Sequence, residues 1–573
     1  MLKIIWQHTN KFQRVCLFVA PLIMLMEVFC DLQQPTLMAY IVDKGLVSGG
    51  RLGIIIQTGV TMVLFAIGGL LSGAGCNAFG SLASLGMGQQ LRNHLMTLAL
   101  TARNGHEMST PTLITRITND VIQMQNLVMT LTRSMIRAPF LLLGGVVMSF
   151  IISPRLAWIL VVVVPILLIF MILVIRRSVP LFTTVQQAID KINRVMRETL
   201  LGIKTVKSYV LEDQQYNAFN QTNDRVKESS IVAQQSIIIL SPVVILALNI
   251  SVVAALWFGG RLHAENAITN GQIIAFVNYM IQITNAMINT VNTVSSLSRA
   301  QTATIRINEI LQLKREPVQT PTIATPKLSS VQFNQVSFAY QDGENVLNDV
   351  SFELDSGQKM GIIGTTGSGK TTLVNLITRL YDPTSGSIKL GGIDIRDLTI
   401  AQIRRKVAVA LQTSTLFSGT ITSNLRYGKV DATEAQLQEA ARAADADAFI
   451  QQRDAGYLAT VDQRGNNFSG GQKQRLNIAR ALIAQPDILI LDDVTSSVDL
   501  ATDARIQHAI RQTRRDRTTI MISQRVSAIM DSDLILVLDH GTVMGMGTHQ
   551  QLMQRSAFYR SIAIDQLGGM KNE

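Results

Sequence analysis

Cysteine and charge are both scarce in this sequence. Only three of 573 residues are cysteines (Cys16, Cys30 and Cys76), and all three lie in apolar runs without the spacing of metal ligands. A disulfide framework and a cysteine metal site are therefore excluded as organising features. Charged residues make up only 16% of the chain and apolar residues 47%, so a wholly soluble enzyme is excluded as well. Part of the chain is expected to lie in a lipid bilayer.

The apolar residues concentrate between about 15 and 310 and predict six membrane spans. These spans are expected at about 15–42, 54–80, 130–152, 156–178, 232–258 and 271–295. The connections at 81–128 and 177–230 are long and rich in Lys and Arg, whereas the other connections are short and carry few basic residues. Because Lys and Arg favour the cytoplasmic side, we expect a multi-pass protein of the cell membrane with both termini in the cytoplasm. The same bias explains the net charge of +11 without a nucleic-acid partner.

A proline-rich stretch marks a domain boundary. Three prolines between residues 315 and 326 prevent a helix there. We therefore divide the chain into a membrane domain (1–312), a linker (313–327) and a cytoplasmic domain (328–573). From Val331 onward, short β-like runs alternate with helical segments, a pattern typical of an α/β fold.

The second domain is organised around the stretch GTTGSGKT at 364–371. It fits the pattern G-x-x-x-x-G-K-[ST], in which backbone N–H groups wrap a phosphate chain. Lys370 would reach the outer phosphates, and the hydroxyl of Thr371 would complete the shell of a Mg²⁺ ion. A buried strand is expected at 359–363 and a helix from Thr372, so that a helix N-terminus also faces the anion.

Two further motifs accompany this phosphate loop. The apolar run 488–492 ends in Asp492, which is placed to hold Mg²⁺ through water. The stretch FSGGQ at 468–472 precedes a segment rich in Arg and Ala and predicts a nest of backbone donors at a helix N-terminus. Such a stretch alone is more often a flexible turn. Its position about 100 residues after the loop, shortly before the apolar run, favours a second anion site.

Over essentially its whole length, the chain resembles ATP-binding-cassette (ABC) exporters of the six-span half-transporter type. The matching features, in chain order, are Tyr340, the phosphate loop, Gln412, Arg464-Gly465, the signature 468–472, Asp492 and Ser497-Val-Asp499. The resemblance implies a membrane α-helical bundle of six transmembrane helices with long cytoplasmic extensions, fused to a P-loop α/β nucleotide-binding domain.

The resemblance also implies a role for each motif residue. Contacts to ATP are expected from Tyr340, Gly364, Thr365, Thr366, Gly367, Ser368, Gly369, Lys370, Thr371, Thr372 and Gln412. Mg²⁺ would be held, directly or through water, by Thr371, Gln412 and Asp492. Since two nucleotide domains pair head to tail in this family, ATP bound to a partner would be contacted by Ser469, Gly470, Gly471, Gln472 and Asp499. Two coupling helices, near 107–114 and 203–212, would dock onto nucleotide domains, the second onto the partner's.

Two positions depart from the family pattern. The carboxylate that polarises the attacking water is usually Glu, and here it is Asp493, one methylene shorter. The His near the γ-phosphate is replaced by Gln524, which cannot carry a proton. These are the catalytic positions, and both are altered while the signature is intact. The resemblance then implies that this chain is one half of a heterodimeric bacterial multidrug exporter. The ATP site at this chain's own phosphate loop would be slow, and the homologous partner would carry the intact Glu and His.

The cargo is less constrained by the sequence. Glu27 and Asp31 lie in the first span, four residues apart on one helix face, and could attract cationic, amphipathic drugs. They could equally pair with a polar neighbour. The expected substrate is a hydrophobic small molecule. A lipid or peptide exporter subunit, or a regulatory ATP-sensing subunit, remain alternatives.

Overall fold

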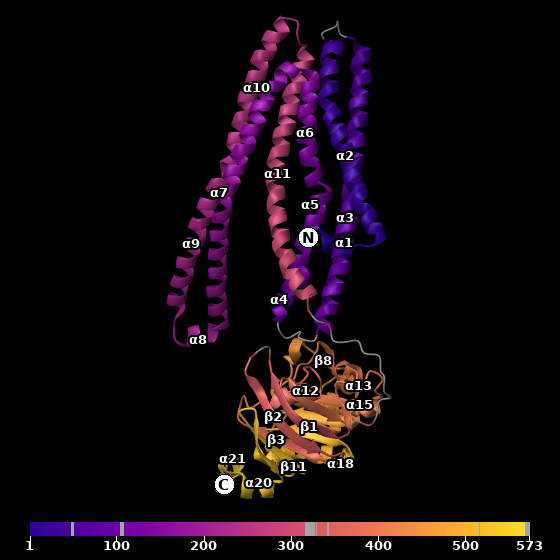
Figure 1. The fold of residues 1–573 in the computed structure, drawn as a ribbon, viewed down its shortest axis with the longest axis vertical. Helices are drawn as coiled ribbons and strands as arrows, with labels where there is room; N and C mark the ends of the chain where they lie inside the picture. Colours follow the sequence, from indigo (N-terminus) through magenta and orange to yellow (C-terminus); the bar gives the residue numbers. More distant parts are fainter. Residues whose placement is uncertain are drawn as a thin grey trace. The chain divides into compact units, whose positions relative to one another are not determined.

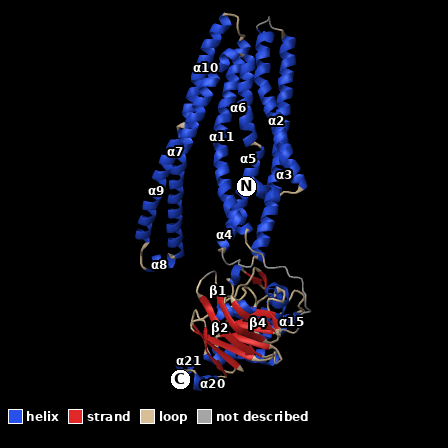
Figure 2. Cartoon of the chain, viewed as in Figure 1, coloured by secondary structure: helices blue, strands red, loops and turns tan. Residues whose placement is uncertain are grey.

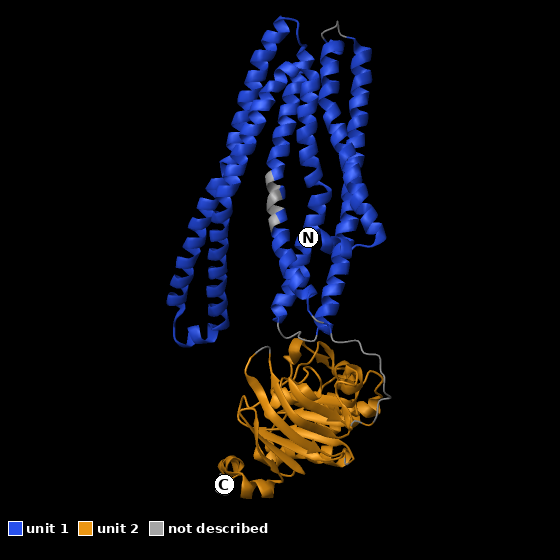
Figure 3. Cartoon of the chain, viewed as in Figure 1, with its two compact units in different colours: residues 1–315 blue, residues 316–573 orange. Residues whose placement is uncertain are grey.

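The computed structural model divides the chain into two compact units, Met1–Arg315 and Glu316–Glu573, each described here by itself (Figure 3). The residues that the structure describes are 1–46, 51–102, 108–313, 315, 327, 329–340, 343–514 and 516–567. Most of the predicted linker, 313–327, and the start of the first predicted coupling helix, at 107, lie outside the described residues.

The described part of the first unit is helical (Figures 1 and 2). Its α-helices are α1 (Leu2–Gln7), α2 (Lys11–Tyr40), α3 (Leu52–Thr101), α4 (Thr110–Thr115), α5 (Val121–Thr132), α6 (Ser134–Ile152), α7 (Pro154–Leu201), α8 (Ile203–Ser208), α9 (Glu212–Ile238), α10 (Leu240–Ala264) and α11 (Asn270–Leu311). Two π-helical segments, η1 (Ile41–Leu46) and η3 (Arg116–Asp120), continue α2 and α4.

Five helical stretches of the described chain are long and apolar enough to cross a membrane. They are Lys11–Leu46, Leu52–Thr101, Thr110–Ile152, Pro154–Leu201 and Glu212–Ala264, and they contain the first five predicted spans. The sixth predicted span lies on α11, a continuous helix of 42 residues that carries many Asn, Gln and Thr side chains among its apolar ones. The helices extend well beyond the ~20 residues needed to cross hydrocarbon, as expected.

Local signals explain where these helices begin. The α7 helix begins after Ser153, whose hydroxyl accepts a hydrogen bond from the Leu156 N–H, and Pro154 occupies its first position, where no N–H is needed. The α11 helix begins with a capping box between Thr269 and Gln272. In Figure 1, α7 and α9 run side by side and are joined by the short α8.

Two buried apolar clusters hold the first unit together. One joins α1, α3, α5 and α11, and the other joins α6, α7, α10 and α11. Large apolar side chains also point outward along the spans, among them Leu71, Leu143, Ile169 and Trp257. A bilayer would cover this outward apolar surface, because soluble proteins rarely expose an apolar surface of this extent to water.

The second unit combines strands and helices. Its strands are β1 (Val331–Ala339), β2 (Asn345–Leu354), β3 (Lys359–Gly364), β4 (Ser385–Leu390), β5 (Ile393–Asp394), β6 (Val407–Ala410), β7 (Gly419–Thr420), β8 (Thr460–Val461), β9 (Ile488–Asp492), β10 (Thr518–Ile522), β11 (Leu534–Asp539) and β12 (Thr542–Gly547). Its α-helices are α12 (Lys370–Ile377), α13 (Ile400–Lys406), α14 (Ile421–Arg426), α15 (Glu434–Ala443), α16 (Asp447–Gln451), α17 (Gly470–Ile483), α18 (Leu500–Thr513), α19 (Val526–Ile529), α20 (His549–Arg555) and α21 (Ala557–Leu567).

The larger sheet positions the predicted site. It has the order β12-β11-β3-β10-β9-β6, and the pairs from β11 to β6 are parallel. Strands β9 and β10 are buried along their whole length, as expected for strands covered on both faces. The carboxyl ends of β3, β9 and β10 therefore meet at one edge, where loops of an α/β sheet bind ligands. A second sheet, β2-β1-β4-β5, is antiparallel.

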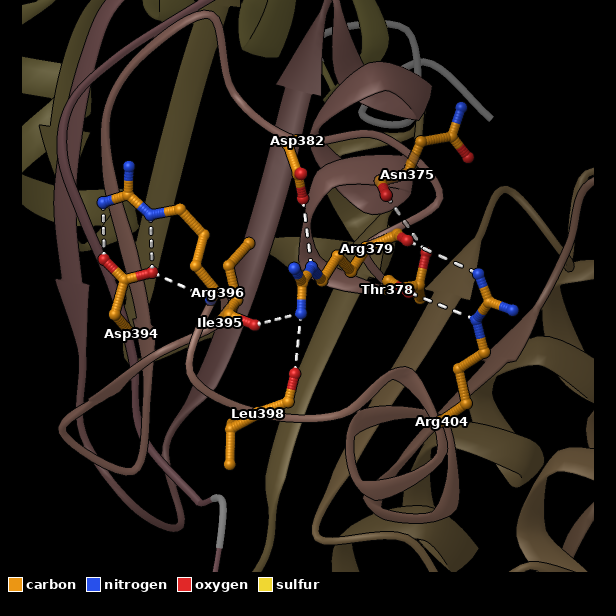
Figure 4. A network of polar contacts seen from close by, with 9 residues as sticks. All are labelled: Asn375, Thr378, Arg379, Asp382, Asp394, Ile395, Arg396, Leu398 and Arg404. Atoms are coloured by element: carbon orange, nitrogen blue, oxygen red, sulfur yellow. Dashed lines mark hydrogen bonds and ion pairs between the residues drawn. The ribbon is translucent and has the colours of Figure 1, made fainter. Parts of the chain in front are cut away.

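A buried arginine secures the helix that follows the phosphate loop (Figure 4). Arg379 lies just after α12 with a positive φ of 50°. Its guanidinium donates hydrogen bonds to the carbonyl oxygens of Ile395 and Leu398, at 2.8 and 2.6 Å, and pairs with Asp382 at 3.0 Å. These bonds anchor the end of α12 to the chain that enters α13.

Candidate functional site

The phosphate loop has the predicted strand–loop–helix form, between β3 and α12. Gly367 and Gly369 have φ angles of 83° and 98°, which residues other than glycine rarely adopt. A Cβ atom on Gly364 would lie 2.0 Å from the Leu538 carbonyl oxygen, so a side chain has no room there either. The hydroxyl of Thr365 donates to Asp539 at 2.8 Å and ties the loop to β11. The loop is thus held in one conformation by its own sequence and by the neighbouring strand.

Lys370 folds over this loop. Its ammonium donates to the carbonyl oxygens of Gly364 and Thr365, at 2.9 and 2.7 Å. Burial lowers the pKa of Lys370, against the charges of Asp492 and Asp493, which raise it. A phosphate oxygen carries more negative charge than a carbonyl oxygen and would compete well for this ammonium.

Asp492 ends β9 and is only 3% exposed. Burial raises its pKa, as does the neighbouring charge of Asp493, while Lys370 and a hydrogen bond from the Thr371 hydroxyl lower it. No group of three or more His, Cys, Asp or Glu side chains that could hold a metal occurs among the described residues. A hydroxyl and one buried carboxylate fit Mg²⁺, which keeps waters and binds phosphate oxygens rather than a full protein cage.

Asp493 follows with an unusual backbone. Its φ is +48°, and its N–H donates to the Ile522 carbonyl at 2.9 Å. Its carboxylate accepts a hydrogen bond from the side-chain amide of Gln412 at 3.2 Å. Burial raises the pKa of Asp493, whereas Lys370, Arg525 and the Gln412 hydrogen bond lower it. The structure therefore brings Gln412, Asp493 and Lys370 to the same edge of the sheet.

Gln524 lies in the loop after β10, next to this edge, with an exposed side chain. Its main-chain carbonyl accepts a hydrogen bond from the side-chain amide of Gln566 at 2.8 Å, and the Gln566 side-chain oxygen accepts from the Val526 N–H at 2.7 Å. Gln566 belongs to α21 and was not singled out by the sequence. No described residue forms a hydrogen bond with the Gln524 side chain itself.

Tyr340 lies at the end of β1 and contacts the helix of the phosphate loop. Its hydroxyl is 3.0 Å from the Thr372 hydroxyl. Its ring meets Phe338 and Tyr381 edge-on, at centroid distances of 4.8 and 5.1 Å. The ring is therefore fixed by three contacts near the loop, and its stacking on adenine stays a prediction.

The signature lies at the start of α17. Ser469 is the N-cap: its hydroxyl accepts from the Gln472 N–H at 3.3 Å, and its own N–H donates to the Gln472 side chain at 3.1 Å. A Cβ on Gly471 would lie 3.0 Å from the Ser497 carbonyl, so the helix start packs closely on the segment before α18. Within the described chain, no hydrogen bond or ion pair joins the signature residues 469–472 to the loop residues 364–372.

The segment before α18 is held by residues that the sequence analysis missed. Gln474 receives a hydrogen bond from the Ser497 N–H at 3.1 Å and donates to the Ser496 hydroxyl at 3.3 Å. Arg525 donates to the Ser496 carbonyl at 3.2 Å. Asp499, which the sequence analysis had named, caps α18 by accepting from the Thr502 N–H at 2.9 Å, and hydrogen bonds from the backbone and side chain of Thr502 lower the pKa of Asp499. The sequence feature that could have pointed to Gln474 is its long amide side chain, two residues after Gln472 in the helix that the signature begins.

The two carboxylates of the first span share one partner in the first unit. Arg137 on α6 forms ion pairs with Glu27 and with Asp31, both at 2.9 Å. Glu27 is only 7% exposed, and its second carboxylate oxygen, Oε2, has no hydrogen-bond partner. The structure thus supplies the polar neighbour that the sequence left open, and a substrate role for Glu27 and Asp31 stays a prediction. The signal for Arg137 was a basic residue inside the predicted third span.

Family models match most of the chain. The model described as the ABC transporter transmembrane region matches residues 17–287, and the one described as ABC transporter matches residues 347–496. The first covers the membrane unit from within α2 to within α11, and the second covers the phosphate loop, the signature and Asp492.

Known proteins resemble the chain over its length. An uncharacterized ABC transporter ATP-binding protein of Mycobacterium tuberculosis is 36% identical over 588 residues, covering 99% of this chain and 98% of that protein. A fatty acid ABC transporter ATP-binding/permease protein of the same species is 35% identical over 448 residues, covering 78% of this chain and 71% of that protein. The solved structure of a bacterial Atm1-family ABC exporter with ATP bound matches with a TM-score of 0.81 and 24% identity, over 96% of this chain and 99% of that one.

Proposed function

This chain belongs to the ABC transporter family, and from this premise we propose that it is one half of a heterodimeric, ATP-driven exporter. In the proposal its cargo is amphipathic drugs or other lipophilic compounds. Its own phosphate loop forms a slow ATP site, and its signature completes the active site of a homologous partner that carries an intact catalytic Glu and His.

The observation that carries the proposal is the pair Asp493 and Gln524. The Asp493 carboxylate is one methylene shorter than Glu and is engaged by Gln412 at 3.2 Å. A base placed about 1 Å from its productive position can cost ~10²-fold in rate. Gln524 can neither accept a proton nor carry a positive charge, so the second aid at the γ-phosphate is also missing. ATP would therefore bind at this chain's loop and hydrolyse slowly.

The binding residues of this site are otherwise complete. Lys370, Thr371 and Asp492 lie together at the sheet edge and suit ATP with Mg²⁺, as argued above. When bound, ATP with Mg²⁺ supplies the negative charge and the leaving group for phosphoryl transfer. The chain's own residues would hold the phosphates and orient the metal, but they would not activate water well.

A partner is supported by two surfaces of this chain. The signature has its capping box formed but no bond to the chain's own loop within the described residues. The end of the arm made by α7 and α9 exposes large apolar side chains: Leu201 is 82% exposed, Tyr209 73% and Val210 81%. Such a patch fits docking to another protein. It flanks α8, which covers most of the second predicted coupling helix.

The orientation in the membrane follows from the distribution of basic residues. The two long connections, 81–128 and 177–230, carry eleven Lys and Arg residues, whereas the three short connections carry four. We place the long connections, both termini and the ATP-binding unit in the cytoplasm, in a cell membrane.

A lipid cargo is the second candidate. A relative 35% identical to this chain carries fatty acid transport in its name. A substrate of that class is also lipophilic and amphipathic. This alternative therefore changes the expected cargo and leaves the proposed ATP sites unchanged.

The test is to purify this chain alone and together with its partner and to measure ATP turnover in both preparations. Low turnover by the lone chain and full turnover by the pair is the expected result. Full turnover by the lone chain would overturn the proposal. Transport into vesicles, compared with vesicles that hold only the partner, separates an exporter subunit from a regulatory one.

A further inference from the structure

A pocket of about 290 Å³ lies inside the membrane unit, between the junction of α5 and α6 on one side and α11 on the other. Two arginines, Arg133 and Arg137, line it together with the polar side chains of Ser134, Asn289 and Thr293. Its remaining wall includes the apolar side chain of Leu141. The pocket therefore combines two cations and several hydrogen-bonding groups with an apolar wall.

The two carboxylates near the pocket are not shared equally between its two arginines. Both nearby carboxylates, Glu27 and Asp31, pair with Arg137 at 2.9 Å, and neither lines the pocket. Arg133 donates to the neutral side chain of Asn77 at 3.0 Å and forms no ion pair with any described residue. Among the described lining residues, no carboxylate faces the cavity. Arg133 therefore lines the pocket without a carboxylate in ion-pair contact among the described residues, and Glu27, whose charge it also feels, is already paired with Arg137.

The backbone at Arg133 is irregular. It separates α5 from α6 with φ of −118° and ψ of −76°. The Thr132 carbonyl is approached by the Cys76 thiol at 3.7 Å. Within membrane spans, non-helical backbone is tolerated where it is buried in protein or lines a cavity. The interruption thus marks the pocket as a built feature of the third span.

The pocket lies toward one end of its span. Between Arg137 and the end of α6 at Ile152, the helix runs for about 22 Å at 1.5 Å per residue. With a hydrocarbon core of about 30 Å, this places the arginines near the cytoplasmic side of the bilayer in the proposed topology. Arg133 lies about 28 Å from Ile152 by the same measure, close to the depth at which the headgroups of the inner leaflet begin.

We propose that this pocket binds the anionic headgroup of an amphipathic substrate, such as a carboxylate or a phosphate monoester. A guanidinium matches the planar, bidentate geometry of these anions, and the hydrogen bonds are stronger for being charge-assisted. A cavity of about 290 Å³ holds a headgroup with its first methylenes but not a whole drug-sized molecule. The inference rests on the proposed export of lipophilic compounds and assigns their headgroup charge as negative, whereas Glu27 and Asp31 had suggested positive.

The test uses three photo-crosslinking probes that share one diazirine-bearing twelve-carbon tail and end in a carboxylate, a neutral alcohol or a trimethylammonium group. The chain is reconstituted with its partner in phosphatidylcholine nanodiscs, and labelling of the peptides around 130–141 and 286–293 is quantified by mass spectrometry. We expect the carboxylate probe to label these peptides at least tenfold more than the other two. R133Q should remove about tenfold of that preference, because a charge-assisted contact is lost.

Matched variants make the result specific. R177Q removes an exposed arginine on α7 and should leave labelling unchanged. R133K keeps the charge without the planar fork and should lose only part of the preference, and R133E should favour the ammonium probe. Competition by phosphatidylglycerol would identify a membrane lipid as the source of the headgroup, and no competition would identify the added amphiphile. Equal labelling by the three probes, or an unchanged preference in R133Q, would overturn the inference.

This outcome is separable from that of the proposed function. If the pair hydrolyses ATP and transports only neutral or cationic compounds, without anion-selective labelling, the headgroup site fails and the exporter stands. If labelling is anion-selective but the lone chain turns over ATP fully, the site stands and the heterodimer proposal fails.

Discussion

The side-chain amide of Gln412 donates a hydrogen bond to the carboxylate of Asp493 at 3.2 Å. The contact joins a residue expected to hold Mg²⁺ to the residue that would polarise the attacking water. The bond engages one carboxylate oxygen and offsets part of the rise in the Asp493 pKa that burial causes, because it stabilises the charged form. The proposed slow hydrolysis is therefore attributed to the placement and engagement of the Asp493 carboxylate.

Restoring the two altered positions should restore hydrolysis at this chain's own loop. The double variant D493E/Q524H is assayed with a partner whose catalytic Glu is changed to Gln, so that only this site can turn over. We expect phosphate release to rise by about 10²-fold, since the base regains its reach. Adding K370A should abolish the gain. No increase over the unmodified chain would mean that other residues slow the site.

The signature should matter more to turnover than the chain's own catalytic position. In the pair, S469A is expected to lower turnover severalfold, because it removes the N-cap of α17, worth about 1 kcal/mol, at a residue assigned to the partner's ATP. D493N should change turnover little, since that site contributes little. Steady-state ATPase rates of the two variants decide the matter. A larger loss in D493N than in S469A would contradict the proposed division of labour.

Lys359 should make stability depend on pH. Burial and, to a smaller extent, the charge of Arg511 lower the pKa of Lys359 to about 8, although Asp531 and other carboxylates oppose this shift. Between this value and the ordinary value of 10.5, the unfolded chain binds more protons than the folded one, so the free energy of unfolding rises with pH across that window. The thermal midpoint of the unmodified chain should therefore rise relative to K359M between pH 7.5 and 9.5. K429M serves as the matched control and should follow the unmodified chain.

Arg137 should be needed for the stability of the chain only while its two carboxylate partners are present. R137M leaves Glu27 and Asp31 unpaired in the membrane unit and should destabilise the chain by on the order of 3 kcal/mol. The triple variant E27Q/D31N/R137M removes all three charges and should recover most of the loss. Thermal midpoints in detergent are the measurement, with R177M as control. Failure of the triple variant to recover would assign Arg137 a role beyond this pairing.

Features that depend on neighbouring residues could be predicted from the sequence. The phosphate loop, the strand ending at Asp492 and the N-cap at Ser469 follow from local patterns of glycine, apolar residues and capping residues, and the structure has them. The first five spans were also predictable, because a long apolar run has few alternatives to a membrane helix.

Contacts between distant segments could not be predicted in this way. Glu27 and its partner Arg137 are 110 residues apart in the sequence, and nothing local to either specifies the pairing. The bonds of Gln474 and Arg525 to the segment before α18 depend on how α17 and the loop after β10 pack together. The helix interruption at Arg133 has no glycine or proline at the break to announce it.

The contacts of Gln566 have a practical consequence for anyone who truncates or tags this protein. One amide side chain near the C-terminus holds the Gln524 carbonyl and the Val526 N–H together. A deletion that removes α21, or a fusion that unwinds it, would release the loop that carries Gln524. A C-terminal fusion therefore needs a spacer that leaves this helix folded.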